Sequence, residues 1–584
     1  MTSPTSRPQH GRNSRGEQAA RRSKGVTQSP THRKPYTYNS LHGTDTIRIL
    51  RLEPGKKSDA IRGRLYESNL RHDKGADFEA LSYTWGVADH SHTLSTPKGV
   101  IKISTNLAAA LRRIRSETRS QHVWADAVCI NQKDLKERGR QVKLMGQVYS
   151  TARRVLVWLG PDRHHRARAI FAMVLNHHQT ASMQGLEELG DGLKELLRCE
   201  WFSRLWVVQE YHLARSALCM WGETDIDFRD LRRSFKAVVM TDNSYSPWVA
   251  PKERSFTVFE LLSSIRGLQC SEERDRVYAT LALPYRDTPN LVARIRQITP
   301  RYDLPEGRNM FEYARAFVES SCIYLLLSQV CHGPTISPNS HGLSWLPNLS
   351  TPAPGDFLPL DIVPRDTNMP EDLAQERVDV AHKTLYLTGW ARTGTICKIG
   401  PSMNTEAGGS RLEDIAAFWK YHVYPDRSRV GHSAYIYKET LFAQVLACRS
   451  WKMELSVHWE YLYSVITRHS ASPWSFALSK NALKMLRSLE TSVTSNENYD
   501  QFLRFDPPQH YWKQRRLVKS AEGLIGMAPL ATLQGDIIAH FPQFSLPCVL
   551  RPRDGHYLFV GTMFMPGLPT VHAASEGYRT FNIR

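Results

Sequence analysis

Three early segments of the chain carry the hydrophobic patterns of β-strands. Residues Ile47–Leu52 alternate apolar and basic positions, as a half-buried strand does. In Ala80–Gly86 the large apolar residues fall on every second position until Gly86 interrupts them, which predicts a strand ending in a loop. The run Val155–Leu159 is apolar throughout and is followed by Gly160-Pro161, as expected of a strand buried on both faces.

Between these strands, apolar residues recur at helical spacing. Asn106 can cap a helix in which Leu107 and Leu111 share one face. Asp134, followed three residues later by Glu137, has the spacing of a capping box at the start of the next helix. The further elements expected are the helices Glu137–Tyr149, Arg166–Gln179 and Phe202–Ala214 and the strands Val123–Asp126 and Ala217–Trp221.

Strands and helices therefore alternate from residue 79 to residue 221. This order predicts crossover connections and a doubly wound, mainly parallel sheet with helices on both faces, which is an α/β domain. Ligands of such sheets bind at the carboxyl ends of the strands. In this chain those ends are the loops after Trp85 and Asp126.

The 584 residues exceed what one hydrophobic core usually supports, and we expect four regions. Residues 1–34 form a basic tail that we expect to be disordered. Residues 35–225 hold the α/β domain with its lead-in strands and a core at 78–221. The pattern of residues 226–375 is mainly helical, and that of residues 376–584 predicts an α+β region of short strands with intervening helices.

The composition argues against several classes of protein. The nine cysteines form no CxxC pair and no zinc-ligand spacing, so we expect reduced thiols, a cytoplasmic location and no metal. No segment has the ~18 apolar residues of a membrane span. The net charge of +19 is concentrated partly in residues 1–34, which carry eight Arg and Lys against one Glu. Such a tail can contact nucleic acid, but we favour a solvated extension, because the chain has no nucleic-acid recognition motif.

Four sequence blocks resemble those of fungal heterokaryon-incompatibility (HET) domain proteins. They are FEALSYTWG (78–86), VWADAVCINQKDLKERGRQVKLMGQVY (123–149), VLVWLG (155–160) and WFSRLWVVQEYHLAR (201–215). The resemblance extends more weakly downstream, and it departs at residues 301–303 and 561–572. It implies an incompatibility or innate-defence protein that triggers growth arrest or cell death when self-association or a protein partner activates it.

HET domains in turn resemble Toll/interleukin-1 receptor (TIR) domains, some of which cleave NAD. In those enzymes the catalytic Glu lies in a Trp-x-x-x-Glu stretch, and this chain has Trp206 and Glu210 at that spacing. The resemblance therefore implies a TIR-like sheet, NAD as the candidate substrate and no required cofactor. About forty residues, 161–200, separate the strand at 155–159 from this helix, which differs from a close TIR match.

The residues themselves also single out Glu210. Its flanking residues make the helix apolar nearly all round, so the carboxyl group should be buried. A buried carboxyl group is costly unless it is paired, and its pKa rises without a partner. Such groups gather at functional sites. The alternative is a structural salt bridge to Arg204, Arg215 or Arg153.

Cleavage of the nicotinamide–ribose bond passes through an oxocarbenium-like state, which a nearby carboxylate stabilises. Ser82, Trp85 and Gly86 could then supply a hydroxyl group, a stacking surface and close backbone approach to the dinucleotide, and Trp206 belongs to the same site. Asp126 could orient a ribose hydroxyl group, or it could cap the turn through Asn131. A Gly-x-Gly-x-x-Gly fingerprint is missing, which argues against an ordinary Rossmann dehydrogenase.

Two functions of different classes follow from the sequence. The first is an NAD glycohydrolase with Glu210 as its acidic residue, which the Trp-x-x-x-Glu spacing favours. The second is a non-catalytic interaction module that recruits a death effector, which the lack of a second clear catalytic residue favours.

Overall fold

The computed structural model describes residues 34–71, 77–86, 89–176, 183–239, 256–285, 288–305, 308–336, 342–350, 376–379, 381–390, 394–402, 418, 422, 514–541, 544, 546–565 and 578–584. The expected disorder of the tail falls outside these residues, apart from Lys34. The helices expected between the C-terminal strands fall largely outside them as well.

The N-terminal region is built on a nine-stranded sheet in the order β5-β4-β2-β1-β6-β3-β7-β8-β9. Its centre consists of the parallel strands β6, β3, β7 and β8. Strand β3 comes first among these in the chain and lies between β6 and β7, as the first strand of a doubly wound sheet does. The strands are β1 (Thr46–Leu52), β2 (Ile61–Asn69), β3 (Glu79–Tyr83), β4 (His92–Thr96), β5 (Gly99–Ile103), β6 (Gln121–Trp124), β7 (Arg154–Trp158), β8 (Ala217–Trp221) and β9 (Thr224–Asp227).

The strands expected from the sequence are found, except that the strand expected at Val123–Asp126 ends at Trp124 and Asp126 begins a helix. Strands β3 and β6 are neighbours paired in parallel, with Glu79 opposite Val123. The sheet as a whole is mixed, however, because the pairs β1–β2, β1–β6, β4–β5 and β8–β9 are antiparallel. Of these pairs, β4–β5 and β8–β9 are joined by short hairpins, which can pair only in this way. A mainly parallel arrangement therefore holds for the four central strands, whereas the other pairs are antiparallel except for β2 and β4.

The first helix, α1 (Thr105–Ile114), is capped by Ser104, whose Oγ accepts the N–H of Leu107 at 3.3 Å. The expectation that Asn106 caps this helix is wrong. The Asn106 amide instead donates to the carbonyl oxygen of Thr84 at 2.7 Å and accepts from Nε1 of Trp158 at 2.9 Å. It therefore ties α1 to the ends of β3 and β7.

The third helix, α3 (Leu135–Thr151), is capped by Asp134 as the sequence predicts. Glu137 does not complete a capping box. Its carboxylate, with its side chain only 2% exposed, forms an ion pair with Arg48 at 2.6 Å. The pattern around Asp134 could not show this, because Arg48 lies on β1, 89 residues earlier in the chain.

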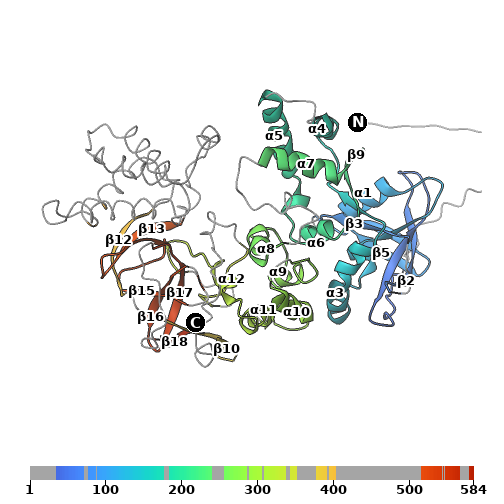
Figure 1. Ribbon diagram of the computed structural model, residues 1–584. Helices are drawn as coiled ribbons and strands as arrows, with labels where there is room; N and C mark the ends of the chain where they lie inside the picture. Colours follow the sequence, from blue (N-terminus) through green and yellow to red (C-terminus); the bar gives the residue numbers. More distant parts are fainter. Residues whose placement is uncertain are drawn as a thin grey trace, which may run out of the picture.

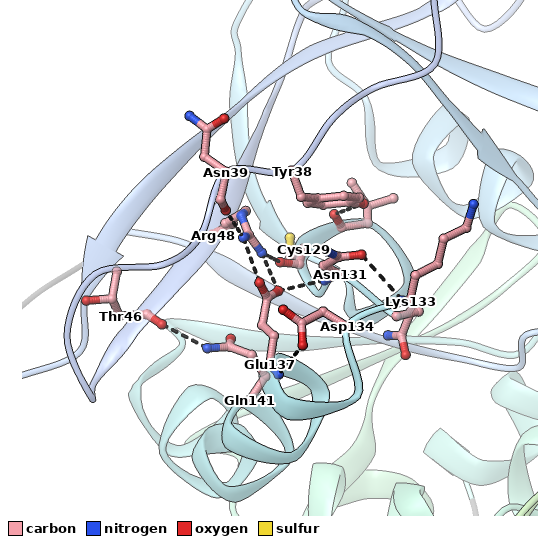
Figure 2. A network of polar contacts seen from close by, with 12 residues as sticks. Tyr38, Asn39, Thr46, Arg48, Cys129, Asn131, Lys133, Asp134, Glu137 and Gln141 are labelled. Atoms are coloured by element: carbon pink, nitrogen blue, oxygen red, sulfur yellow. Dashed lines mark hydrogen bonds and ion pairs between the residues drawn. The ribbon is translucent and has the colours of Figure 1, made fainter. Parts of the chain in front are cut away.

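Arg48 and Glu137 are the centre of a buried network that holds the loop between α2 (Asp126–Cys129) and α3 (Figure 2). The Arg48 guanidinium also donates to the carbonyl oxygens of Cys129 at 3.2 Å and Asn39 at 2.5 Å. The Glu137 carboxylate accepts the backbone N–H of Asn131 at 2.8 Å. Removal of either partner would leave a buried charge and at least one backbone group unsatisfied, so this network fixes the loop that follows Asp126.

Helices dominate the chain after the sheet, as expected for this region. The stretch from residue 308 to residue 327 holds two helices, because Ser321 between them takes the left-handed conformation with φ of 53°. The remaining helices are α4 (Ala167–Asn176), α5 (Met183–Leu197), the short 3-10 helix η2 (Glu200–Ser203), α6 (Trp206–His212), α7 (Phe228–Val239), α8 (Val258–Ser264), α9 (Asp275–Tyr278), α10 (Pro289–Gln297), α11 (Arg308–Glu319) and α12 (Ile323–Leu327).

The C-terminal region contains two sheets, with the orders β10-β11-β18-β17-β16-β15 and β12-β13-β14. The short strands expected in this region are found, among them β11, β15, β16 and β17. The bounds are β10 (Arg377–Asp379), β11 (Thr384–Trp390), β12 (Ile396–Ser402), β13 (Arg515–Ser520), β14 (Ile525–Pro529), β15 (Ile537–Ala539), β16 (Cys548–Arg553), β17 (His556–Thr562) and β18 (Tyr578–Ile583).

Helices α8 to α12 lie between the N-terminal sheet and the C-terminal sheets (Figure 1). Buried apolar side chains form one continuous cluster across these parts, including Ile47, Tyr313 and Phe581. None of the helices in the described residues is long and apolar enough to cross a membrane.

Candidate functional site

A cleft of about 1020 Å³ opens at the carboxyl ends of β3 and β6, where the sequence predicts a ligand site. The residues that follow β3, namely Thr84–Gly86, form one part of its wall, and Asp126 follows β6. The chain around η2 adds a third part, from Leu197 to Trp206. The described residues thus place two strand ends and one helix start around a single cavity.

The cleft carries both signs of charge. Its arginines are Arg138, Arg198 and Arg204, and its acidic residues are Asp126, Glu200, Glu272 and Asp275. Asp126 begins α2, two residues beyond the end of β6. Such a lining suits a ligand that is itself both cationic and anionic, because each charge can find an opposite partner.

Glu210 lies on α6 and is buried, with 2% of its surface exposed. The hydroxyl group of Ser82 donates a short hydrogen bond to its carboxyl oxygen Oε2. Ser82 in turn accepts a hydrogen bond from Nε1 of Trp201 at 2.7 Å. A chain of hydrogen bonds therefore runs from Trp201 through Ser82 to the Glu210 carboxyl group.

Burial raises the pKa of Glu210 to about 7. The positive charge of Arg204 and hydrogen bonds from Ser82 and Tyr149 act in the opposite direction, and the negative charge of Asp126 adds to the rise. The loss of hydration is the larger effect, because the side chain has no access to water. Near neutral pH this carboxyl group is therefore divided between its acidic and ionised forms.

The salt bridges considered for Glu210 are not seen among the described residues. Arg153 pairs instead with Asp77 at 3.3 Å and Glu79 at 3.2 Å. Arg204 donates to the backbone carbonyl oxygen of Tyr83 and acts on Glu210 only through its charge. The partners of this carboxyl group are therefore neutral hydroxyl groups.

Trp85, Gly86 and Asp126 lie together at the mouth of the cleft. Trp85 is 44% exposed, and its Nε1 donates to Oδ2 of Asp126 at 2.8 Å. Gly86 has a φ of 69°, a left-handed conformation that glycine adopts without strain. The alternative in which Asp126 caps the turn through Asn131 is not what the structure shows. Gln132 contacts Asp126 instead, by donating to its carbonyl oxygen at 3.1 Å.

Trp206 is half-buried in the cleft wall, and its Nε1 donates to Oδ2 of Asp275 at 3.1 Å. Of the six predicted site residues, Trp85, Gly86, Asp126 and Trp206 line the cleft. Ser82 and Glu210 are bonded to each other but do not line it. Arg204 and Asp126 connect the two groups, because both line the cleft and both act electrostatically on Glu210.

Sequence reasoning missed the wall residues that come after position 225. Asp275 and Tyr302 line the cleft, as does the stretch Gln269–Glu272. The charged stretch that includes the Arg274-Asp275-Arg276 triplet is the one visible signal. It reads as a structural ion-pair cluster, and nothing in its spacing connects it with Trp206, 69 residues earlier.

The family model described as "Heterokaryon incompatibility protein (HET)" matches residues 78–210, the segment that contains all six predicted site residues. The chain is 26% identical over 233 residues to "Heterokaryon incompatibility protein 6, OR allele" of Neurospora crassa. That alignment covers 37% of this chain and 31% of the relative, so the similarity spans about a third of each protein. No solved structure matches the chain.

Proposed function

Because the chain is a heterokaryon-incompatibility (HET) domain protein, with the domain at residues 78–210, we propose that it is a fungal incompatibility or innate-defence protein. In this proposal it acts in the cytoplasm. Self-association or a protein partner activates the domain, which then cleaves NAD in the manner of TIR-like enzymes and so causes growth arrest or cell death.

The observation that carries the proposal is the buried Glu210 carboxyl group, whose pKa is raised to about 7 on the same helix as Trp206 of the cleft wall. Strongly perturbed carboxyl groups gather at sites of chemistry. The cleft volume of about 1020 Å³ is ample for a dinucleotide. Trp85 and Trp206 offer aromatic surfaces for its rings, and Arg198 and Arg204 offer positive charge for its phosphates.

In the reaction, the bond between C1′ of the ribose and the nicotinamide nitrogen breaks, and nicotinamide leaves with the bonding electrons. Water adds to C1′ and releases a proton, which gives ADP-ribose. The ionised Glu210 carboxylate would stabilise the positive charge that develops on the ribose. Its burial strengthens this interaction, because little water competes with it.

Glu210 does not line the cleft, so the described arrangement corresponds to a resting state in this proposal. Activation must bring the carboxyl group and the ribose together. In this proposal the trigger is self-association or the binding of a protein partner. The proposal therefore predicts low activity of dilute protein and higher activity of concentrated or crowded protein.

The test uses the full chain, concentrated or crowded, with NAD as the probe and nicotinamide release as the measurement. Glu210→Gln should lower the rate by about 100-fold or more, because the charge is lost while the size is kept. Glu223→Gln, at an exposed carboxylate outside the cleft, is the matched control and should keep the wild-type rate. Absence of release by wild-type protein, or an undiminished rate in Glu210→Gln, contradicts the proposal.

A second function is favoured by one observation. The Glu210 carboxyl group is already satisfied by hydroxyl groups of Ser82 and Tyr149, as a purely structural group would be. In this case the domain is a non-catalytic interaction module that recruits a death effector. A wild-type protein that self-associates and arrests growth without releasing nicotinamide would support this function over NAD cleavage.

A further inference from the structure

One wall of the cleft comes from outside the matched HET segment. The residues Gln269–Glu272, Asp275 and Tyr302 line this wall, whereas the family match ends at Glu210. The backbone also connects the two parts, because the N–H of Leu205 donates to the carbonyl oxygen of Gln269 at 2.9 Å. The cleft therefore lies between the HET domain and the helical region that follows it.

Two glycines of α3 allow this close approach. A Cβ atom on Gly139 would lie 2.4 Å from the carbonyl oxygen of Pro300, and one on Gly146 would lie 2.3 Å from the Cβ of Ala282. Both distances are far below van der Waals contact. The helical region is thus packed directly against the backbone of α3, which fixes the position of its cleft-lining residues.

Asp275 is the residue through which this region acts on the cleft. It is only 4% exposed, and each of its carboxyl oxygens accepts one hydrogen bond from a ring. Oδ2 accepts from Nε1 of Trp206 at 3.1 Å, and Oδ1 accepts from the hydroxyl group of Tyr302 at 2.6 Å. A hydrogen bond at the far end of a ring restrains the side-chain torsions, so Asp275 sets the orientation of both rings.

The ring of Tyr302 is held on its other side by α3. The guanidinium carbon of Arg138 lies 3.7 Å from the centroid of the Tyr302 ring, which is a cation–π contact. Arg138 also pairs with Glu272 at 2.7 Å. All four of these side chains line the cleft, and they form one connected unit: Glu272, Arg138, Tyr302 and Asp275.

We infer that Asp275 is a positioning residue of the cleft, which is itself held by Tyr302 and fixes Trp206 as a surface for a flat aromatic ring of the ligand. The ligand class is a nucleotide with such a ring, and for NAD the ring is nicotinamide or adenine. For its ligand this inference rests on the proposed function. The helical region therefore supplies one wall of the binding site, and residues 78–210 alone do not hold Trp206 in place.

The position of Trp206 can be measured without any ligand. The full chain is labelled with 5-fluorotryptophan, and Trp206→Phe identifies its fluorine resonance by loss of one signal. Asp275→Asn and Tyr302→Phe should move or broaden this resonance. Asp303→Asn, at the exposed neighbouring carboxylate that pairs with Arg301 at 2.9 Å, is the control and should leave it unchanged. A resonance that does not move in Asp275→Asn and Tyr302→Phe overturns the inference.

The consequence for the ligand is measured by NAD binding and nicotinamide release. Asp275→Asn should raise Kd and KM for NAD by about tenfold and change kcat less, because one restraining hydrogen bond is lost. The double variant with Asp275→Asn and Trp206→Phe should bind NAD little more weakly than Trp206→Phe alone, since Asp275 acts through that ring. The inference is overturned if the losses of NAD affinity in the two single variants add fully in the double variant. It is also overturned if KM is unchanged although the fluorine resonance shifts. If wild-type protein neither binds nor cleaves NAD, the proposed function fails, and the fluorine experiment alone decides the role of Asp275.

Discussion

At the scale of the residue, the hydrogen bond from Ser82 shows which partners the buried Glu210 carboxyl group has. Ser82 has neither a free hydroxyl group nor access to the cleft, because it lies between Trp201 and Glu210 in a buried chain of hydrogen bonds. The carboxyl group at the end of this chain has neutral partners, so burial dominates its ionisation. Its protonation state should therefore affect the stability of the fold.

The first prediction concerns the pH dependence of stability. The pKa of Glu210 in the folded state, about 7, lies above the ordinary value of 4.5. The folded state thus holds this proton more tightly than the unfolded state, and the stability it contributes is complete below about pH 4.5 and is lost as pH rises through 7. Glu210→Gln cannot lose a proton. Between pH 5 and 8 its free energy of unfolding should improve relative to wild type by about 1–3 kcal/mol, as measured by urea unfolding.

The matched control for this titration is Glu223→Gln. Lys57 lowers the pKa of the exposed Glu223 carboxylate, so the sign is reversed and its titration lies below about pH 4.5. Between pH 5 and 8 the stability curves of Glu223→Gln and wild type should therefore run parallel. Curves for wild type and Glu210→Gln that run parallel across this pH range would show that Glu210 keeps an ordinary pKa.

The burial of Glu210 could be predicted from the sequence, but its partner could not. An apolar helix surface around residues 205–214 is a local pattern. The hydrogen bond from Ser82 joins residues 128 positions apart, and it exists only because β3 and α6 are neighbours in the folded sheet. Arginines close to Glu210 in the sequence therefore suggested a salt bridge that the described residues do not form.

At the scale of the elements, helix α3 contributes to three parts of the structure. It carries Glu137 toward β1 and Arg138 toward the cleft, and its glycines face the helical region. Its N-terminal cap at Asp134 was predictable, because a cap is set by adjacent residues. The role of Gly139 and Gly146 was not, because the atoms they accommodate come from positions 300 and 282.

The second prediction concerns these glycines. In an exposed helix, Gly→Ala stabilises by up to about 1 kcal/mol. Gly139→Ala and Gly146→Ala should instead destabilise by about 1–3 kcal/mol, because each Cβ meets a backbone oxygen or a backbone-fixed Cβ that cannot move aside. Thermal unfolding of the single variants measures the effect.

Gly192→Ala on α5 provides the comparison for this pair. Its Cβ would meet the terminal methyl group of Met173 at 2.9 Å, and that methyl group can rotate away. This variant should be neutral or slightly more stable than wild type. Equal behaviour of all three glycines would mean that α3 and the helical region are not in close contact.

At the scale of the whole molecule, distant segments complete each sheet. Strand β18 pairs with β11 over six residues and lies next to β17, so it joins β10 and β11 to the rest of the C-terminal sheet. This sheet contacts the helical region through His332, whose Nε2 lies 3.0 Å from the carbonyl oxygen of Phe559. Such pairings could not be predicted from short strand patterns, because these patterns give no information on the neighbours of a strand.

The third prediction is that deletion of residues 578–584 divides this sheet. Amide protons of β11 and β17 should lose protection from hydrogen exchange, because they lose their neighbour strand. Strands β3 and β7 should keep their protection, since the N-terminal sheet has its own pairings. Loss of protection throughout the chain would show instead that the continuous core makes the protein one cooperative unit.

The two-part construction of the cleft also has a consequence for inheritance. Its walls are encoded on both sides of position 225, with Trp85, Asp126 and Trp206 before it and Asp275 and Tyr302 after it. Recombination between two related genes near that position would give a protein in which each parent gene encodes a different wall of the cleft. A new recognition specificity could therefore arise in one generation, without any substitution within residues 78–210.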